Sequence, residues 1–339
     1  MKSDRLRRQH KAWKKDQERA KQGQPALSAS RSTEHHRSPI TFLAPAVLSF
    51  LDDPQAAAEF FTRIQGFNKR RDIFVDLSVV RQITPDAIAV LLALVKFLVD
   101  ARRVNVSGSY PDDAKATDKI RESGFDQYVR TSGHPGIGLQ GEIVRRDLLM
   151  TSKKAEASRA KQLIDFAAGK GNRAGHLRLK PSYGHLLECM ANTHQHAGPA
   201  GLTGKETWWA SVYRDRSRHC DCFTFIDMGV GIFRSLEMDM RLKLYNLLNV
   251  TRPAILKRLL RGEIPSSTGK KYRGRGLPGL FESFRCSKIA RLTIITNDVL
   301  ADVQADRFTA LPGSLKGVLL YWEVPHGSSR EDNPSPDRG

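Results

Sequence analysis

Three motifs in the second half of this 339-residue chain restrict its fold more than any other feature. In chain order they are HLLECMANTHQHA at 185–197, FTFIDMGVGI at 223–232 and YRGRGLPGLFESF at 272–284. The first predicts a helix, the second a buried strand that ends in a glycine loop, and the third a glycine loop that opens a helix. This half of the chain is therefore expected to combine helices with a sheet.

The first motif predicts a polar stripe on its helix. Glu188, Asn192 and His196 are spaced four residues apart and so project from one face, while Leu186 and Met190 cover other parts of the helix. Such a stripe lies either against a polar groove or against solvent. Taken alone, the motif is compatible with both.

The second motif places a carboxylate at the end of an apolar strand. Asp227 is followed by Gly229 and Gly231, which let the backbone turn tightly and approach a ligand closely. A carboxylate held there can accept a hydrogen bond from an exocyclic amine such as that of adenine. An ordinary strand-to-loop turn would give the same short pattern.

The third motif carries Gly274, Gly276 and Gly279 around the start of an amphipathic helix. Exposed backbone amides and the positive end of a helix form a site for phosphate oxygens. The order of residues differs from a Walker A loop. It also differs from a dinucleotide-binding fingerprint, because no strand directly precedes it.

Together, Glu-x-x-x-Asn on a helix, Asp-x-Gly-x-Gly at a strand end and Gly-x-Gly-x-x-Gly about forty residues later resemble the N, G1 and G2 boxes of the GHKL superfamily. This superfamily includes the ATP-binding domains of gyrase, sensor histidine kinases, mismatch-repair ATPases and anti-sigma serine kinases. The resemblance covers about residues 150–325, and GVLLYWEVP at 317–325 is similar to the last strand of histidine-kinase catalytic domains. It implies an α/β sandwich in which helices cover a mixed sheet, with ATP and Mg²⁺ as cofactors.

The resemblance also implies roles for the matching residues. Asn192 would bind the Mg²⁺ that bridges the phosphates, and Asp227 would accept a hydrogen bond from the adenine amine. Glu188 matches the general base of the hydrolysing members, and residues 233–273 would form a mobile lid. The other residues expected to contact the nucleotide are His196, Gly229, Gly231, Lys270, Gly274, Arg275, Gly276, Leu277 and Gly279.

One position departs from the family pattern. Family members usually carry a threonine that hydrogen-bonds the aspartate that reads adenine, and Val318 stands at that place here. The missing hydrogen bond is worth about 1 kcal/mol. Thr296, in the strand RLTIITN, is the expected substitute.

Residues 40–130 alternate strand and helix patterns, which predicts a small α/β domain. This order resembles the STAS domain, which anti-anti-sigma factors share with the cytoplasmic tails of anion transporters. In the anti-anti-sigma members a serine at a helix start accepts phosphate; here Thr84-Pro85-Asp86-Ala87 occupies that place. Asp86 would either imitate the phosphorylated serine or act as a first-turn acid favoured by the helix dipole. Strands are expected at 40–45, 72–78 and 103–109, and helices at 55–65, 84–101 and 112–123.

The other segments are polar. Residues 1–39 carry 11 lysines and arginines against four acidic residues and have few apolar residues, which predicts a disordered basic arm. Residues 131–175 are expected to form a linker and a basic helix at 147–168. Residues 176–325 would form the ATP-binding domain, and residues 326–339 a disordered tail.

Composition narrows the class of protein further. A net charge of +19 permits contact with nucleic acid, an acidic protein or a polyphosphate ligand. The four cysteines include no CxxC pair, and no secretory signal or apolar run of membrane-spanning length is recognisable. These features predict a cytoplasmic protein without a membrane span.

The sequence therefore predicts an ATP-binding regulatory protein of bacterial signalling, acting as an ATPase or a protein serine/threonine kinase. A switch that binds ATP without turnover is the main alternative. A nucleic-acid-associated protein is another alternative, which depends on the basic arm alone. The expected partners are ATP, a protein that binds the STAS-like domain, and a second copy of this chain.

Overall fold

A computed structural model describes the chain over residues 38–67, 72–127, 147–152, 155–169, 171–196, 207–238, 250–264 and 276–326. The described residues from Pro39 to His326 belong to one compact unit. Except for Ser38, Pro39 and His326, the expected basic arm and C-terminal tail lie outside the described residues. Within these ranges, no helix has the length and apolar character needed to cross a bilayer.

The N-terminal part of this unit is a parallel α/β arrangement. Its three-stranded sheet has the order β1-β3-β5, and a second pair of short strands, β2 and β4, is also parallel. Helices follow the strands, so the alternation expected for residues 40–130 is confirmed to within a few residues. The strands are β1 (Ile40–Leu43), β2 (Val47–Leu48), β3 (Ile73–Asp76), β4 (Gln82–Ile83) and β5 (Val106–Gly108), and the helices are α2 (Pro54–Gln65), α3 (Pro85–Arg102) and α4 (Ala114–Glu122).

A five-stranded sheet of order β6-β7-β8-β10-β9 forms the centre of the second part. All four strand pairs are antiparallel, so the expectation of a mixed sheet is wrong for the described residues. Short turns join β7 to β8 and β9 to β10, and a hairpin connection makes neighbours antiparallel. The strands are β6 (Asp147–Ser152), β7 (Trp208–Asp215), β8 (Cys220–Asp227), β9 (Arg291–Asp302) and β10 (Arg307–Pro325).

The prediction of a helix over residues 147–168 is wrong for residues 147–152. Residues 147–152 form β6, the edge strand that pairs with β7, and Leu149 is buried there. Only Ala157–Ala168 is helical, as α5. The sheet therefore begins inside the segment expected to be a linker.

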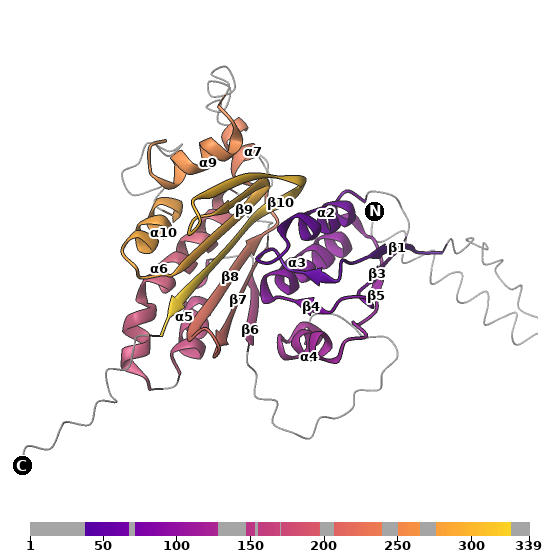
Figure 1. Ribbon diagram of the computed structural model, residues 1–339, viewed down its shortest axis with the longest axis horizontal. Coiled ribbons are helices and arrows are strands. Elements are labelled where there is room, and N and C mark those ends of the chain that lie inside the picture. Colours follow the sequence, from indigo (N-terminus) through magenta and orange to yellow (C-terminus); the bar gives the residue numbers. More distant parts are fainter. Residues whose placement is uncertain are drawn as a thin grey trace, which may run out of the picture. The chain divides into compact units, whose positions relative to one another are not determined.

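Both faces of the five-stranded sheet are covered (Figure 1). Alternate side chains such as Trp208, Phe223 and Trp322 pack in a core with the helices of the second part, where the rings of Phe223 and Trp322 stack at 5.3 Å. The intervening side chains, such as Ile226 and Leu319, belong to a core that includes α2 and α3. The helices of the second part are α5 (Ala157–Ala168), α6 (Arg173–His196), α7 (Ile232–Met238), α9 (Arg252–Leu260) and α10 (Gly276–Arg285).

The N-terminal part is thus joined to the sheet by a common core as well as by the chain. Polar contacts support the apolar ones: the Gln65 side chain donates to the Ser314 carbonyl at 3.2 Å and accepts from the Lys316 amide at 2.6 Å. Burial of each large apolar side chain contributes about 1.5–3 kcal/mol. Helices α2 and α3 therefore form one of the layers that cover the five-stranded sheet.

Asp86 lies in the first turn of α3 and its side chain is fully buried. One carboxylate oxygen accepts from the Phe50 amide at 3.0 Å, and the Thr84 side chain lies beside the carboxylate. Burial raises the pKa of this carboxyl group above its usual value, because the charged form loses its hydration. A buried group cannot present charge to a partner, which argues against a phosphoserine mimic.

We expect Asp86→Asn to unfold at a higher temperature than wild type at pH 7. Folding raises the pKa of the Asp86 carboxyl, so the protonated group favours the native state at low pH, and wild type loses that stability as the pH rises through the folded pKa. Each tenfold difference in proton affinity between the folded and unfolded states is worth about 1.4 kcal/mol. The amide keeps the oxygen for Phe50, and its nitrogen can donate to the hydroxyl oxygen of the neighbouring Thr84. Thermal melts from pH 7 down to pH 4 should show the advantage shrinking; an advantage independent of pH would contradict this account.

Candidate functional site

The polar stripe predicted from the first motif lies on α6, a helix of 24 residues. Leu186 and Met190 are fully buried against the sheet, whereas Glu188 is half-buried and Asn192 is exposed. His196 is the last residue of the helix, and its side chain lies outside the described residues. The stripe therefore runs along the edge of the covered face, with one side packed and one side accessible.

The start of α10 lies directly against this stripe. A Cβ atom placed on Gly276 would come 2.9 Å from the Asn192 Nδ2 atom and 2.9 Å from the Glu188 Cγ atom. Such separations are shorter than real Cβ contacts, so a side chain at this position would displace one of the two residues. The start of α10 at Gly276 thus contacts Glu188 and Asn192 of α6, although Gly276 comes 84 residues after Asn192 in the sequence.

Asp227 closes β8 and is 8% exposed. Its Oδ1 atom accepts from the Gly229 amide at 2.8 Å, which fixes the carboxylate orientation. Val318 on β10 is its strand partner, and the preceding Gly317 lies so close that an added Cβ would come 1.9 Å from the Asp227 carbonyl oxygen. With a φ of +86°, Gly317 is at a position where only glycine fits.

The loop after Asp227 is held by β9. The Thr296 hydroxyl accepts from the Ile232 amide at 2.9 Å and donates to the Gly317 carbonyl at 3.2 Å. Thr296 therefore links the loop after Asp227, at Ile232, to Gly317 on the neighbouring strand β10, and its one hydroxyl hydrogen is used in the bond to Gly317. It supports the loop and the neighbouring strand, which differs from the direct hydrogen bond to Asp227 that we expected.

Asn297 is a second anchor of this loop, and sequence reasoning missed it. Its side-chain oxygen accepts from the Phe233 amide at 3.2 Å and its nitrogen donates to the Val230 carbonyl at 3.0 Å. Its backbone has a φ of +52°, next to an irregularity in the β9–β10 pairing. The available signal was an amide side chain directly after the apolar run of residues 292–296, because asparagine tolerates the left-handed conformation.

Cys189 connects the first two motifs. It is buried on α6 beside Glu188, and burial raises the pKa of its thiol, with further contributions from the nearby carboxylates of Asp227 and Glu188. Both carboxylates therefore lie near one thiol. The end of β8, the polar stripe of α6 and the start of α10 form one region.

A neutral histidine joins α6 to α10. A ring nitrogen of His185 is 2.8 Å from the Ser283 hydroxyl. Burial lowers the pKa of His185 to about 4, and the charge of Lys288 adds to this effect. At neutral pH the imidazole is uncharged, which suits a positioning role for the two helices.

The remaining site residues divide by position. Gly231 ends the loop after β8 with a φ of +80°, as a tight turn requires, and Leu277 and Gly279 lie within α10. Lys270, Gly274 and Arg275 lie outside the described residues, as does much of the expected lid.

Residues 38–326, taken without their undescribed gaps, contain no group of three acidic, histidine or cysteine side chains that could hold a metal ion. The Asn192 amide oxygen, exposed beside the α10 N-terminus, suits Mg²⁺ that is held mainly by phosphates and water.

Comparison with known proteins does not add a family to this geometry. A scan against protein-family models and a search of the curated proteins found no match to the chain.

Proposed function

We propose that this protein is an ATP-binding regulatory protein of the GHKL class, with the nucleotide site at the junction of α6, the loop after β8 and the start of α10. The contact of Gly276 with Glu188 and Asn192 carries the proposal. It joins the two motifs that lie farthest apart in the sequence, in the arrangement that a shared phosphate site needs. A chance resemblance of short patterns would not require this contact.

Each component of the site has a role that its chemistry suits. Asp227 would accept from the adenine amine, since its carboxylate is fixed by the Gly229 amide. The backbone amides at the start of α10, a ten-residue helix with no acidic residue in its first turn, would bind phosphate oxygens. Asn192 would hold Mg²⁺ beside those phosphates.

Glu188 is the candidate general base. It is half-buried one helical turn from Asn192 and would take a proton from a water or a substrate hydroxyl during in-line attack on the terminal phosphate. This role makes the protein an ATPase or a protein serine/threonine kinase. We propose that the STAS-like N-terminal part, residues 40–130, binds the protein partner in bacterial signalling.

A switch that binds ATP without turnover is the second candidate, and the common core favours it. Because α2 and α3 share a core with the sheet that carries Asp227, a nucleotide-driven change in the sheet would reach this layer directly. Phosphate-release and phosphotransfer assays on the full chain distinguish the two candidates.

The decisive experiment is a calorimetric titration of the full chain with ATP, with and without Mg²⁺. Wild type should bind ATP more tightly with Mg²⁺, and Asn192→Ala should lose that gain by about tenfold or more, which corresponds to about 1.4 kcal/mol. It should retain the metal-free affinity, since adenine is recognised elsewhere. Lys180→Ala, at an exposed position of the same helix, is the matched control. Absence of ATP binding by folded wild type would refute the proposal.

A further inference from the structure

A cavity of about 310 Å³ lies between the segment after β2 and the paired ends of β9 and β10. This volume suits a small organic ligand. Thr293, which lines it, pairs with Tyr321, three residues from the Val318 partner of Asp227. Because side chains alternate along a strand, an odd spacing places the cavity on the sheet face opposite Asp227. The cavity is therefore separate from the proposed nucleotide site.

The Thr293 hydroxyl is an unsatisfied polar group in the cavity wall. The residue is 4% exposed, and its Oγ1 atom is buried without a hydrogen-bond partner. A buried hydroxyl in this state costs about 1–3 kcal/mol, and few native groups are left so. A rotation of the Thr293 side chain about its Cα–Cβ bond would turn the hydroxyl toward the cavity, where a ligand that accepted a hydrogen bond from it would remove this cost.

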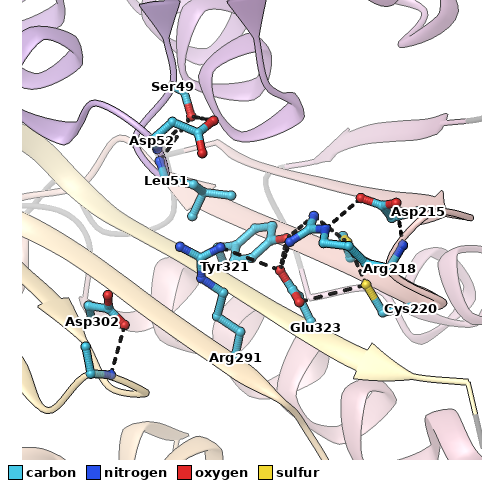
Figure 2. A network of polar contacts seen from close by, with 12 residues as sticks. Ser49, Leu51, Asp52, Asp215, Arg218, Cys220, Arg291, Asp302, Tyr321 and Glu323 are labelled. Carbon is cyan, nitrogen blue, oxygen red and sulfur yellow. Dashed lines mark hydrogen bonds and ion pairs between the residues drawn. The ribbon is translucent and has the colours of Figure 1, made fainter.

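Arg291 supplies positive charge two residues earlier on the same face of β9. Its side chain is 25% exposed, and Figure 2 shows its guanidinium near the Tyr321 ring, whose centroid is 6.0 Å away. Among the described residues, its one ion-pair partner is the Glu323 Oε1 atom at 3.9 Å. That oxygen already accepts from Arg218 and from the Tyr321 hydroxyl, each at 2.6 Å. The planar donors of Arg291 thus remain available for a ligand.

The other charged groups of the wall restrict the charge of a ligand. Asp302 pairs with Arg307 at 3.2 Å, and an Asp52 oxygen accepts from Ser49 at 2.9 Å and Gln82 at 2.7 Å. The two acids balance the two arginines of the cavity, so the second negative charge of a dianion would find no unpaired cation in the wall. A single carboxylate matches one guanidinium fork and one hydroxyl.

We propose that this cavity binds a small organic monocarboxylate. Arg291 and Thr293 hold the carboxylate, and the apolar body packs against Phe50, Leu51 and Leu300. The ligand contacts both the segment after β2 and the five-stranded sheet. Binding at this cavity does not require a nucleotide at the other site.

Three probes test the chemistry of the site in calorimetric titrations of the full chain. Sodium benzoate carries a carboxylate on an apolar ring, benzamide is its neutral analogue, and inorganic phosphate is the small dianion. Benzoate should bind at least about tenfold more tightly than benzamide, because only benzoate pairs with the guanidinium. Equal affinities, or no heat of benzoate binding at millimolar concentration, would overturn the proposal.

Two variants locate the binding in the cavity. Thr293→Val and Arg291→Gln should each weaken benzoate binding about tenfold or more, while Arg258→Gln, at an exposed position on α9, should leave it unchanged. Thr293→Val keeps the side-chain shape and removes an unsatisfied hydroxyl, so it should unfold at the same temperature as wild type or higher. If Arg291→Gln fails to fold, the benzoate affinity of Thr293→Val alone tests whether the ligand binds in this cavity. The carboxylate site would be refuted if folded Thr293→Val bound benzoate as tightly as wild type does. It would also be refuted if wild type bound phosphate and this variant did not.

Discussion

Asp227→Asn should weaken ATP binding by about 100-fold or more while the protein stays folded, a loss of about 2.7 kcal/mol. The structure gives the reason. An aspartate oxygen already accepts from the Gly229 amide at 2.8 Å. In the variant, the single amide oxygen stays with Gly229, and the amide nitrogen then faces the adenine amine. A donor meets a donor, and an interaction with a charged acceptor, worth about 1.5–3 kcal/mol, is lost.

Calorimetry with ATP and Mg²⁺ measures this effect, and thermal melts verify the fold. Asp118→Asn is the matched control, because Asp118 is exposed on α4 in the N-terminal part. The control should bind ATP as wild type does. Unchanged affinity in a folded Asp227→Asn protein would mean that the loop after β8 does not read adenine.

The local patterns predicted the elements of this fold well where one face of an element is buried. The expected strand at 72–78 and helix at 84–101 correspond to β3 and α3. Strand β6 was missed because its partner β7 lies about 60 residues away, and an edge strand depends on that pairing more than on its own sequence. Long-range pairing is not visible in a window of neighbours.

The sequence did contain a signal for the common core, which the domain-by-domain interpretation overlooked. Residues 87–94 of α3 are all buried. A helix that is apolar on every side is covered on every side, and here α3 lies between the parallel β1-β3-β5 sheet and strands β7 and β8. The pattern was assigned to a helix but not to a central layer.

The candidate site was predictable only in the residues that its motifs contain. Glu188 and Asn192 lie on one helix, spaced as a shared face requires, and Gly276 lies against them, as the resemblance to the GHKL superfamily implied. The support from Thr296 and Asn297 and the His185–Ser283 contact were not predictable, because each depends on strand register or helix packing. Such positioning residues follow from the tertiary structure and carry little local pattern.

Glu188→Ala should separate an enzyme from a switch. The Glu188 carboxylate lies beside the start of α10, next to the expected phosphate site, while adenine recognition is assigned to Asp227. The variant should therefore bind ATP and Mg²⁺ as wild type does. Its turnover should fall by about 10²- to 10⁴-fold, the usual contribution of a positioned general base.

Phosphate release and phosphotransfer, measured on samples whose ATP affinity is known, test this expectation. Glu59→Ala is the matched control, since Glu59 is exposed on α2 on the other side of the sheet. A wild-type rate that survives in Glu188→Ala would end the catalytic role of Glu188 and leave the α6 stripe as a binding surface. A wild type that binds ATP and Mg²⁺ but neither releases nor transfers phosphate would favour the switch, because the nucleotide would then act only through its effect on the sheet and on α2 and α3.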